Sequence, residues 1–296
     1  MAKARHIVKR RKAVTNIRKI TKTMQLISTA RFQAAFNRAT ATKPYTQKIT
    51  QLVEELSQAA QGQIDHPLMR PNPDAKKDIV LVLTSNRGYC GGYNTNLLRK
   101  AIDFLDRPGD RENVLHVVGK KGITYFRFLG RPVSWSTIEI GEQPRFEQVE
   151  PIATEFMNRY EAGEIGQVHV VYMKFISTGR QVSDVMRLLP LSTDKGEKTG
   201  SDAPAAKGSA SVQYDFSPEP EELLKTLLPQ TVKIRLFQAF TDMAVSEQVA
   251  RMVAMKAATD AASDMIKTLT RQYNRARQSQ ITMELLDIVG GAEALK

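Results

Sequence analysis

The residues with the greatest potential for chemistry lie in one short segment, SNRGYCGGYNTN, which follows a run of apolar residues. Gly88, Gly91 and Gly92 stand between an expected strand and an expected helix, as glycines do in loops that hold nucleotide phosphates. The segment lacks the GxGxxG spacing of a dinucleotide-binding loop, and it lacks the lysine followed by serine or threonine of a phosphate-binding loop. We therefore interpret the three glycines as tight-turn residues.

Other constellations of reactive side chains are equally weak. Cys90, the single cysteine, excludes an internal disulfide and fits a reducing compartment, and we interpret it as a buried thiol. The four histidines are scattered without metal-ligand spacing, HExxH does not occur, and no Ser, His and Asp set lies in a recognisable elbow. We expect no catalytic centre, no metal site and no cofactor.

The elements around this turn alternate between strand and helix. The stretch from Asp78 to Leu105 reads as a buried strand, a glycine turn and an amphipathic helix. NVLHVVGKKGITYFRFLG predicts a second strand and helix, and QVHVVYMKFIS predicts a later strand. This alternation predicts a small Rossmann-like α/β domain over residues 76–191.

Long helices are expected at both ends of the chain, over residues 1–58 and 217–296. In the first, apolar residues alternate in steps of four and three, with Arg31 in the one missing place: Ala13, Ile17, Ile20, Met24, Ile27 and Ala34. The second follows the same rule with Met252, Met255, Thr259, Ala262, Ile266, Leu269, Tyr273 and Ala276. This spacing is typical of a coiled-coil seam, although two core helices of a bundle also fit it.

The limits of the C-terminal helix follow from its breakers. Between Pro229 and Gly290 there is no glycine or proline. The pair Gly290 and Gly291 is expected to end the helix. Residues 192–216 are rich in small and polar residues, which predicts a mobile loop between the α/β domain and this helix.

Charge is distributed unevenly along the 296 residues. The formal net charge is +12, and thirteen lysines and arginines precede the first acidic residue, Glu54. Such a segment is typical of a solvated basic helix, a nucleic-acid-binding arm or a transit peptide. The helical pattern continues past any plausible cleavage point, which disfavours the transit peptide. No run of about 18 apolar residues is present, so we expect no membrane span.

Three segments together carry a resemblance to a known family. RRKAVTNIRKITKTMQLISTARF, GYCGGYNTN, and SEQVARMVAMKAATDAASDMI leading to YNRARQSQITMELLDIVGGAEAL resemble the gamma subunit of the rotary F-type ATP synthase, in the same order. The likeness covers nearly the whole chain. It implies that the two terminal helices form a long antiparallel coiled coil, with the α/β domain between them in sequence.

The resemblance also implies a function. The coiled coil would be the central stalk, standing inside a hexamer of three alpha and three beta subunits, with the epsilon subunit and the ring of c subunits at the α/β domain. The chain would be non-catalytic, and its rotation would couple ion transport to ATP synthesis or hydrolysis on beta. Membrane association would be peripheral and only through the complex, at the cytoplasmic face of a bacterial inner membrane.

The residues that match hexamer-contacting positions of the family are Lys22, Met24, Arg251, Gln278, Thr282 and Glu284. Chloroplast members of the family carry an inserted pair of cysteines at the place of residues 192–216, and this chain has none there. We therefore expect no dithiol switch. The alternative from another class is a basic coiled-coil protein that binds nucleic-acid phosphates through its N-terminal helix.

Overall fold

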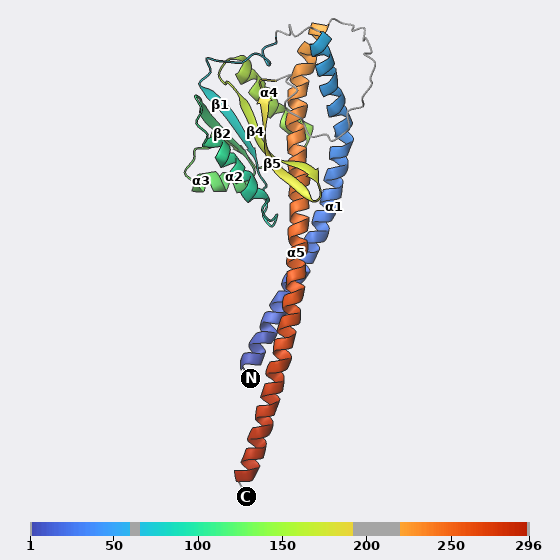
Figure 1. Cartoon of the computed structure of the whole chain (residues 1–296), viewed down its shortest axis with the longest axis vertical. Helices are drawn as coiled ribbons and strands as arrows, with labels where there is room; N and C mark the ends of the chain where they lie inside the picture. Colours follow the sequence, from blue (N-terminus) through green and yellow to red (C-terminus); the bar gives the residue numbers. More distant parts are fainter. Residues whose placement is uncertain (1, 60–65, 192–219, 295–296) are drawn as a thin grey trace. The chain divides into compact units, whose positions relative to one another are not determined.

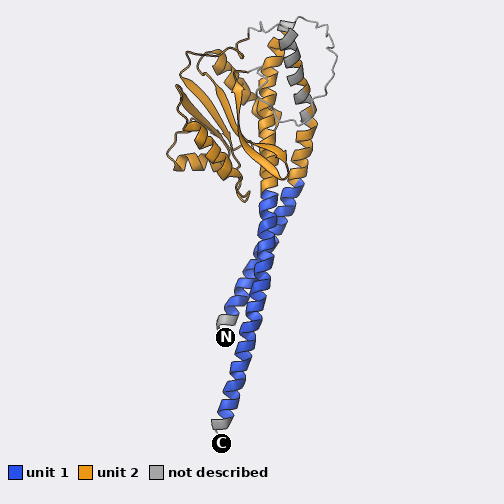
Figure 2. Cartoon of the chain, viewed as in Figure 1, with its two compact units in different colours: residues 1–30, 251–296 blue, residues 31–250 orange. Residues whose placement is uncertain are grey.

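The computed structural model describes residues 2–59, 66–191 and 220–294 (Figure 1). Its contacts group the chain into two compact units, one of residues 1–30 and 251–296 and one of residues 31–250 (Figure 2). The elements in chain order are α1 (Ala2–Ala59), β1 (Lys77–Leu83), α2 (Tyr93–Leu105), β2 (Glu112–Val118), α3 (Lys120–Phe128), β3 (Trp135–Thr137), α4 (Phe146–Glu161), β4 (Val168–Ser177), β5 (Arg180–Leu189) and α5 (Pro220–Ala294).

A five-stranded sheet forms the centre of the second unit. The strand order is β3-β2-β1-β4-β5; the first four strands are parallel and β5 is antiparallel to β4. The expected continuous apolar run is confirmed in β1, where every residue from Ile79 to Leu83 is fully buried. Such a run is typical of a parallel strand that is covered on both faces.

Helices cover both faces of this sheet. On β2, His116 stacks against Phe156 of α4, with ring centroids 5.6 Å apart. On β4, His169 stacks against Phe104 of α2, with ring centroids 4.8 Å apart. The register pairs His116 with Leu81 and His169 with Val80. Val80 and Leu81 are adjacent residues of β1. Successive residues of a strand point to opposite faces, so α2 and α4 lie on opposite sides of the sheet.

The helix α5 joins the α4 side. Phe237 of α5 packs edge-on against Phe146 of α4, and the Lys233 ammonium contacts the Glu150 carboxylate at 2.7 Å. The apolar core of the unit therefore includes α5 side chains at helical spacing, namely Leu224, Leu228, Val232, Leu236, Phe240 and Met243.

The expectation that Gly290 and Gly291 end the C-terminal helix was wrong. The helix begins at Pro220, continues through Pro229 and ends at Ala294, beyond Gly290 and Gly291. An internal proline costs about 3 kcal/mol, but burial of the leucines and valines around Pro229 in the sheet core outweighs this cost. The two glycines lie in open space, where each lowers helix propensity by about 1 kcal/mol without ending the helix.

Three elements of the α/β region were not predicted from the sequence. These are the three-residue edge strand β3, the antiparallel strand β5 and the helix α4, whose sequence contains Pro151. The proline stands in the second turn of α4, and Val149, Ile152, Phe156 and Tyr160 bury the face that makes the helix amphipathic. The strand–helix alternation itself is confirmed by the element order.

The predicted division of the chain into residues 1–58, 76–191 and 217–296 stays a prediction, since the compact units divide within α1 and α5. The expected mobile loop, residues 192–216, lies outside the described residues.

Candidate functional site

The candidate site is the pair of helices in the first unit. Buried side chains of α5 recur along the predicted seam, and each of the eight predicted residues is buried or half-buried, which confirms this seam. Its apolar centre is formed by Val14 of α1 with Ala262 and Leu269 of α5, flanked by Ile7 and Ile266. Val14 lies near Leu269 while Thr21 contacts Thr259, so the two helices run antiparallel.

The seam predicted on α1 was wrong. Ile17, Ile20 and Ile27 are 53%, 60% and 46% exposed, whereas the buried positions of this part of α1 are Val14, Thr21 and Ser28. The buried set keeps the seven-residue repeat but lies on a different stripe of the helix. Thr21 and Ser28 have small side chains that fit at the contact, and the Thr21 hydroxyl donates to the Arg18 carbonyl at 3.1 Å.

This change of register leaves an apolar stripe on the outer surface of α1. Its exposed members are Ile17, Ile20 and Ile27; Leu26 is also exposed, but it lies about 100° from Ile27 around the helix axis. A second exposed apolar surface occupies the end of α5: Ile281, Met283, Leu285, Leu286, Ile288 and Val289. Contiguous exposed apolar residues mark interaction surfaces, so both stretches are candidate docking surfaces that the sequence reasoning missed. The sequence of α1 did indicate its outer stripe, because this helix has more apolar residues than one coiled-coil seam buries.

The predicted partner-contact residues of α1 lie on the same part of that helix as the apolar stripe. Lys22 is exposed and its ammonium donates to the Gln25 amide oxygen at 3.4 Å, while Met24 is half-buried. Lys22 is not covered by other parts of the chain, and Met24 is only partly covered. They remain predicted contacts, with a surface around them that suits a partner.

The predicted partner-contact residues near the end of α5 lie apart from Lys22 and Met24. Gln278, Thr282 and Glu284 are all exposed. Thr282 donates to the Gln278 carbonyl at 3.0 Å, and Glu284 accepts a bond from Gln280 at 2.8 Å. From the contact between Thr21 and Thr259, Lys22 lies opposite α5 residues about 20 positions before Gln278, or about 30 Å along the helix. The structure therefore brings the predicted residues together in two groups.

Arg251 differs from the others because it is only 5% exposed. Its side chain is covered by the chain itself, and this burial does not favour a direct contact with a partner.

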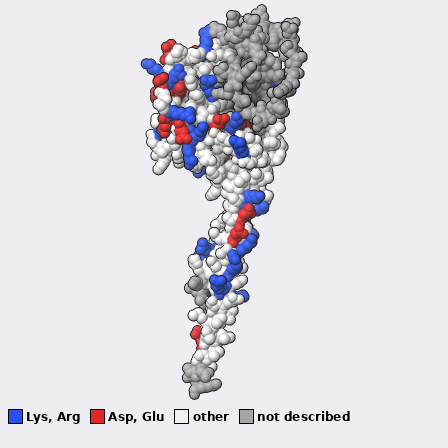
Figure 3. All heavy atoms as spheres, viewed as in Figure 1, with Lys and Arg blue, Asp and Glu red and all other residues white. Residues whose placement is uncertain are grey.

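Charge and aromatic contacts add to the surface of the helix pair. The guanidinium of Arg11 lies over the Tyr273 ring, 5.4 Å from its centroid, which joins the two helices near the start of α1. Lysine and arginine side chains are visible along the helices of this unit in Figure 3. The pair thus offers both apolar and basic surface.

The glycine turn carries no arrangement for catalysis. Ser85 and Asn94 bind each other through the Asn94 amide nitrogen and the Ser85 hydroxyl at 2.8 Å, and that nitrogen also lies 3.2 Å from the Cys90 sulfur. Cys90 is 3% exposed, and Tyr89 and Gly91 adopt positive φ angles of 63° and 55°. These contacts hold a tight turn, as the glycines predicted. Within residues 2–59, 66–191 and 220–294 no group of three acidic, histidine or cysteine side chains could hold a metal ion.

His116 is buried and His169 is half-buried in the sheet, and both are uncharged at neutral pH. Burial lowers the pKa of His116 to about 4, with a smaller contribution from the Arg159 charge, and it lowers the pKa of His169 to about 4, aided by Arg187. Each ring packs against an aromatic side chain, and neither faces a nucleophile that it could activate. Their role is packing.

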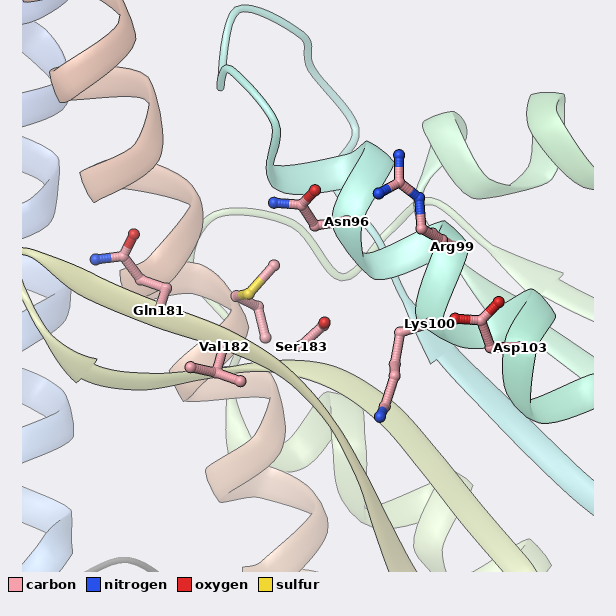
Figure 4. Close-up of a pocket in the computed structure, with 8 residues that line it drawn as sticks. Asn96, Arg99, Lys100, Asp103, Gln181, Val182 and Ser183 are labelled. Carbon is pink, nitrogen blue, oxygen red and sulfur yellow. The ribbon is translucent and has the colours of Figure 1, made fainter.

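A cavity of about 290 Å³ lies between α2 and the β4–β5 hairpin (Figure 4). The side chains of Arg99, Lys100 and Asp103 come from α2, and those of Gln181 and Ser183 come from β5. The groove contains charged and amide groups without a nucleophile and base in contact, so its geometry does not resemble an active site.

No helix among the described segments is long and apolar enough to cross a membrane.

Comparisons with known proteins agree with one another across the chain. Residues 3–295 match the ATP synthase family. Among curated relatives, the ATP synthase gamma chain of Rhodopirellula baltica is 44% identical over 302 residues and covers all of both chains. That of Frankia casuarinae is 42% identical, with 97% of this chain and 96% of the relative covered. That of Leptospira biflexa is 38% identical over the full length of both.

Solved structures match the fold. A chain in the OSCP/F1/c-ring structure of the Euglena gracilis mitochondrial ATP synthase has a TM-score of 0.69 at 18% identity, with 99% of this chain and 95% of that chain covered. A chain in the rotor structure of the same complex has a TM-score of 0.64 at 17% identity, covering 95% of this chain and 99% of that one. These comparisons give no support to the nucleic-acid-binding alternative.

Proposed function

The chain belongs to the ATP synthase gamma chain family, and from this premise we propose that it is the central rotor shaft of an F-type ATP synthase. Its rotation couples ion transport through the membrane ring to conformational cycling of the catalytic beta subunits. One observation carries the mechanism: two long terminal helices pair in antiparallel register while both keep apolar side chains on their outer surface.

The outer surface is what a shaft requires inside a collar of subunits. An asymmetric shaft contacts three equivalent neighbours differently, so its rotation shifts each of them in turn between open and closed states. We infer that the collar is a hexamer of three alpha and three beta subunits. Apolar side chains on α1 and at the end of α5 would pack against it, while basic residues of α1 would favour approach to an acidic surface.

Residue roles follow from this proposal. Lys22 and Met24 would contact the collar at one level, and Gln278, Thr282 and Glu284 would contact it at a second level further along α5. The exposure of Lys22, Gln278, Thr282 and Glu284 supports the assignment; Met24 is half-buried, and Arg251 would act inside the chain.

We further infer that the chain is not itself an enzyme, since its described side chains form no catalytic constellation. The α/β unit would bind the epsilon subunit and the ring of c subunits. Membrane association would then be peripheral, at the cytoplasmic face of a bacterial inner membrane, where the relatives' bacterial origin supports the placement.

Reconstitution tests the proposal. Purified alpha and beta subunits are mixed with the chain, and ATP hydrolysis is compared with that of alpha and beta alone and with a mixture containing the chain that lacks residues 278–296. The full chain should form a stable complex with high ATPase activity, and the truncated chain should form a less active one. No association of the full chain with alpha and beta at modest salt would contradict the proposed function.

A further inference from the structure

The residue that interrupts the predicted apolar pattern of α1, Arg31, is engaged by the α/β part of the second unit. Its guanidinium contacts the carboxylate of Glu142, which lies in the loop between β3 and α4. The second carboxylate oxygen of Glu142 lies 3.8 Å from the guanidinium of Arg87, in the glycine turn after β1. One side chain, 21% exposed, therefore touches both α1 and the turn.

The loop that carries Glu142 is fastened to the sheet. Asn86 donates from its amide nitrogen to the Ile138 carbonyl at 2.8 Å, and its amide oxygen accepts from the Lys120 backbone at 2.9 Å. The Gly119 backbone donates to the Thr137 carbonyl at 2.9 Å, and Ile140 is buried. These bonds join the loop to the ends of β1, β2 and β3, so a force on Glu142 reaches the sheet through one backbone hydrogen bond and two hydrogen bonds of the Asn86 side chain.

A second contact between α1 and the sheet is apolar. Phe32 and Phe36 pack against Phe175 of β4, with ring centroids 6.3 and 5.9 Å apart. These ring contacts hold α1 against β4 without a charge or a hydrogen bond to fix their relative position. An ion pair with hydrogen-bond geometry is directional and opposes sliding of one element along the other.

The two contacts leave α1 at different angles about its axis. Arg31 and Phe32 are successive residues, and successive side chains of an α-helix are separated by about 100°. Contacts at two angles fix the rotation of a helix about its own axis, whereas one contact leaves it free to roll. A small cavity of about 30 Å³ lies beside the ion pair, lined by Glu142 and by residues of α1 and α5, among them Ala35, Arg38 and Phe237. Apolar packing there is incomplete, which places more of the constraint on the charged contact.

We propose that Glu142, together with Arg31 and Arg87, forms a torque-bearing joint that holds α1 against rotation relative to the sheet. Rotation applied to the α/β part is then passed to α1 without slip. The inference rests on the proposed rotor function, and it assigns Glu142 and Arg31 as positioning residues for energy coupling, which is separate from contacts with the hexamer.

The test uses the complete complex in sealed vesicles and measures the ions, protons or sodium, that are transported per ATP hydrolysed. Glu142→Gln and Arg31→Gln should each lower this ratio by about threefold while hydrolysis continues. Loss of one half-exposed ion pair changes a two-state equilibrium by about this factor. The double exchange Arg31→Glu with Glu142→Arg, made in an Arg87→Gln background so that no cation faces the new arginine, should restore at least half of the lost ratio. A residue needed only for folding would lower pumping and hydrolysis together.

Asp106→Asn is the matched control. It removes the ion pair between Asp106 and Arg131, which joins the end of α2 to the loop after α3 and involves no residue of α1, so the ratio should stay at the parent value. If Glu142→Gln does not assemble, Arg31→Gln alone decides. A parent-like ratio in Glu142→Gln or in the deciding Arg31→Gln overturns the joint. Absence of ATP-driven pumping in the parent complex would instead refute the proposed rotor function.

Discussion

The hydroxyl of Thr259 donates a hydrogen bond to the hydroxyl of Thr21 over 2.9 Å, across the contact between α5 and α1. Thr21 is 9% exposed and Thr259 is half-buried, so the bond lies in the seam. The apolar contact around Val14 would tolerate a shift of one helix along the other, because small side chains pack at several offsets. A polar pair in an apolar seam fixes the register, as buried polar residues do in coiled coils.

Substitution of both threonines tests this role. Thr21→Val and Thr259→Val should each lower the free energy of unfolding by about 1 kcal/mol, because the remaining hydroxyl keeps only its bond to a helix carbonyl. The double variant should be less destabilised than the sum, with a coupling energy of about 1 kcal/mol. Urea unfolding followed by circular dichroism measures these values. Thr268→Val, at an exposed position of α5, is the control, and strictly additive effects would contradict a direct bond.

The comparison of the two helices shows where sequence patterns succeed. On α5 the most apolar stripe is also the buried one, so the seam from Met252 to Ala276 was predicted correctly. On α1 the most apolar stripe faces outward and the buried stripe contains Thr21 and Ser28. Periodicity alone assigns the more apolar stripe to the core, and it cannot recognise a helix that needs one seam for its partner helix and another for a partner protein.

The same limit applies to the α/β unit and to the contact residues. The alternation of strand and helix and the glycine turn followed from apolar runs and turn residues. The short strand β3 has too few residues to show a period, and contacts such as Arg31 with Glu142 join residues far apart in the sequence. The exposure of Lys22 or Gln278 follows from the register of the helix pair, which the sequence pattern of α1 misassigned.

The outer stripe of α1 should be needed for assembly and dispensable for folding. Ile20→Gln changes a side chain that is 60% exposed, so the free energy of unfolding should change by less than about 0.5 kcal/mol. Binding to a complex of alpha and beta subunits should weaken by about tenfold, because an apolar contact of that size is lost. Surface plasmon resonance and thermal unfolding measure the two properties.

Leu269→Ala should, in contrast to Ile20→Gln, destabilise the isolated chain. Leu269 is 4% exposed in the seam, and its truncation should lower the free energy of unfolding by about 2 to 3 kcal/mol. If Ile20→Gln destabilised the isolated chain as much as Leu269→Ala does, the outer stripe would belong to the core of the chain and the proposed docking surface would be wrong.

Stability should fall as the solution is acidified below about pH 6.5. Burial lowers the folded-state pKa of His116 and of His169 to about 4, so the unfolded chain takes up protons between these values and the ordinary histidine pKa while the folded chain does not. The loss should reach about 2 kcal/mol for His116 at about pH 5, and less for the half-buried His169. It is absent at neutral pH, where both forms are unprotonated.

Thermal unfolding across this range measures the effect. His116→Gln should reduce the dependence of the unfolding midpoint on pH, although it lowers stability at neutral pH by removing a packed ring. His6→Gln, at an exposed position of α1, should leave the dependence unchanged. An identical pH dependence in His116→Gln and the parent would show that this histidine is not the titrating group.

Gly119 should tolerate no side chain. It adopts a φ of 98°, and a Cβ placed there would lie 2.1 Å from the Thr84 carbonyl oxygen, a backbone atom at the end of β1. Gly119→Ala should therefore cost more than about 3 kcal/mol, because it adds a clash to the strain of the positive φ. Gly130→Ala separates the two effects: its φ is 69° with open space around the added carbon, so only the conformational cost of about 1 kcal/mol applies. Expression and thermal unfolding of both variants decide the matter. Equal costs in the two variants would mean that the approach of Thr84 to Gly119 contributes nothing to the packing of β1 against the start of α3.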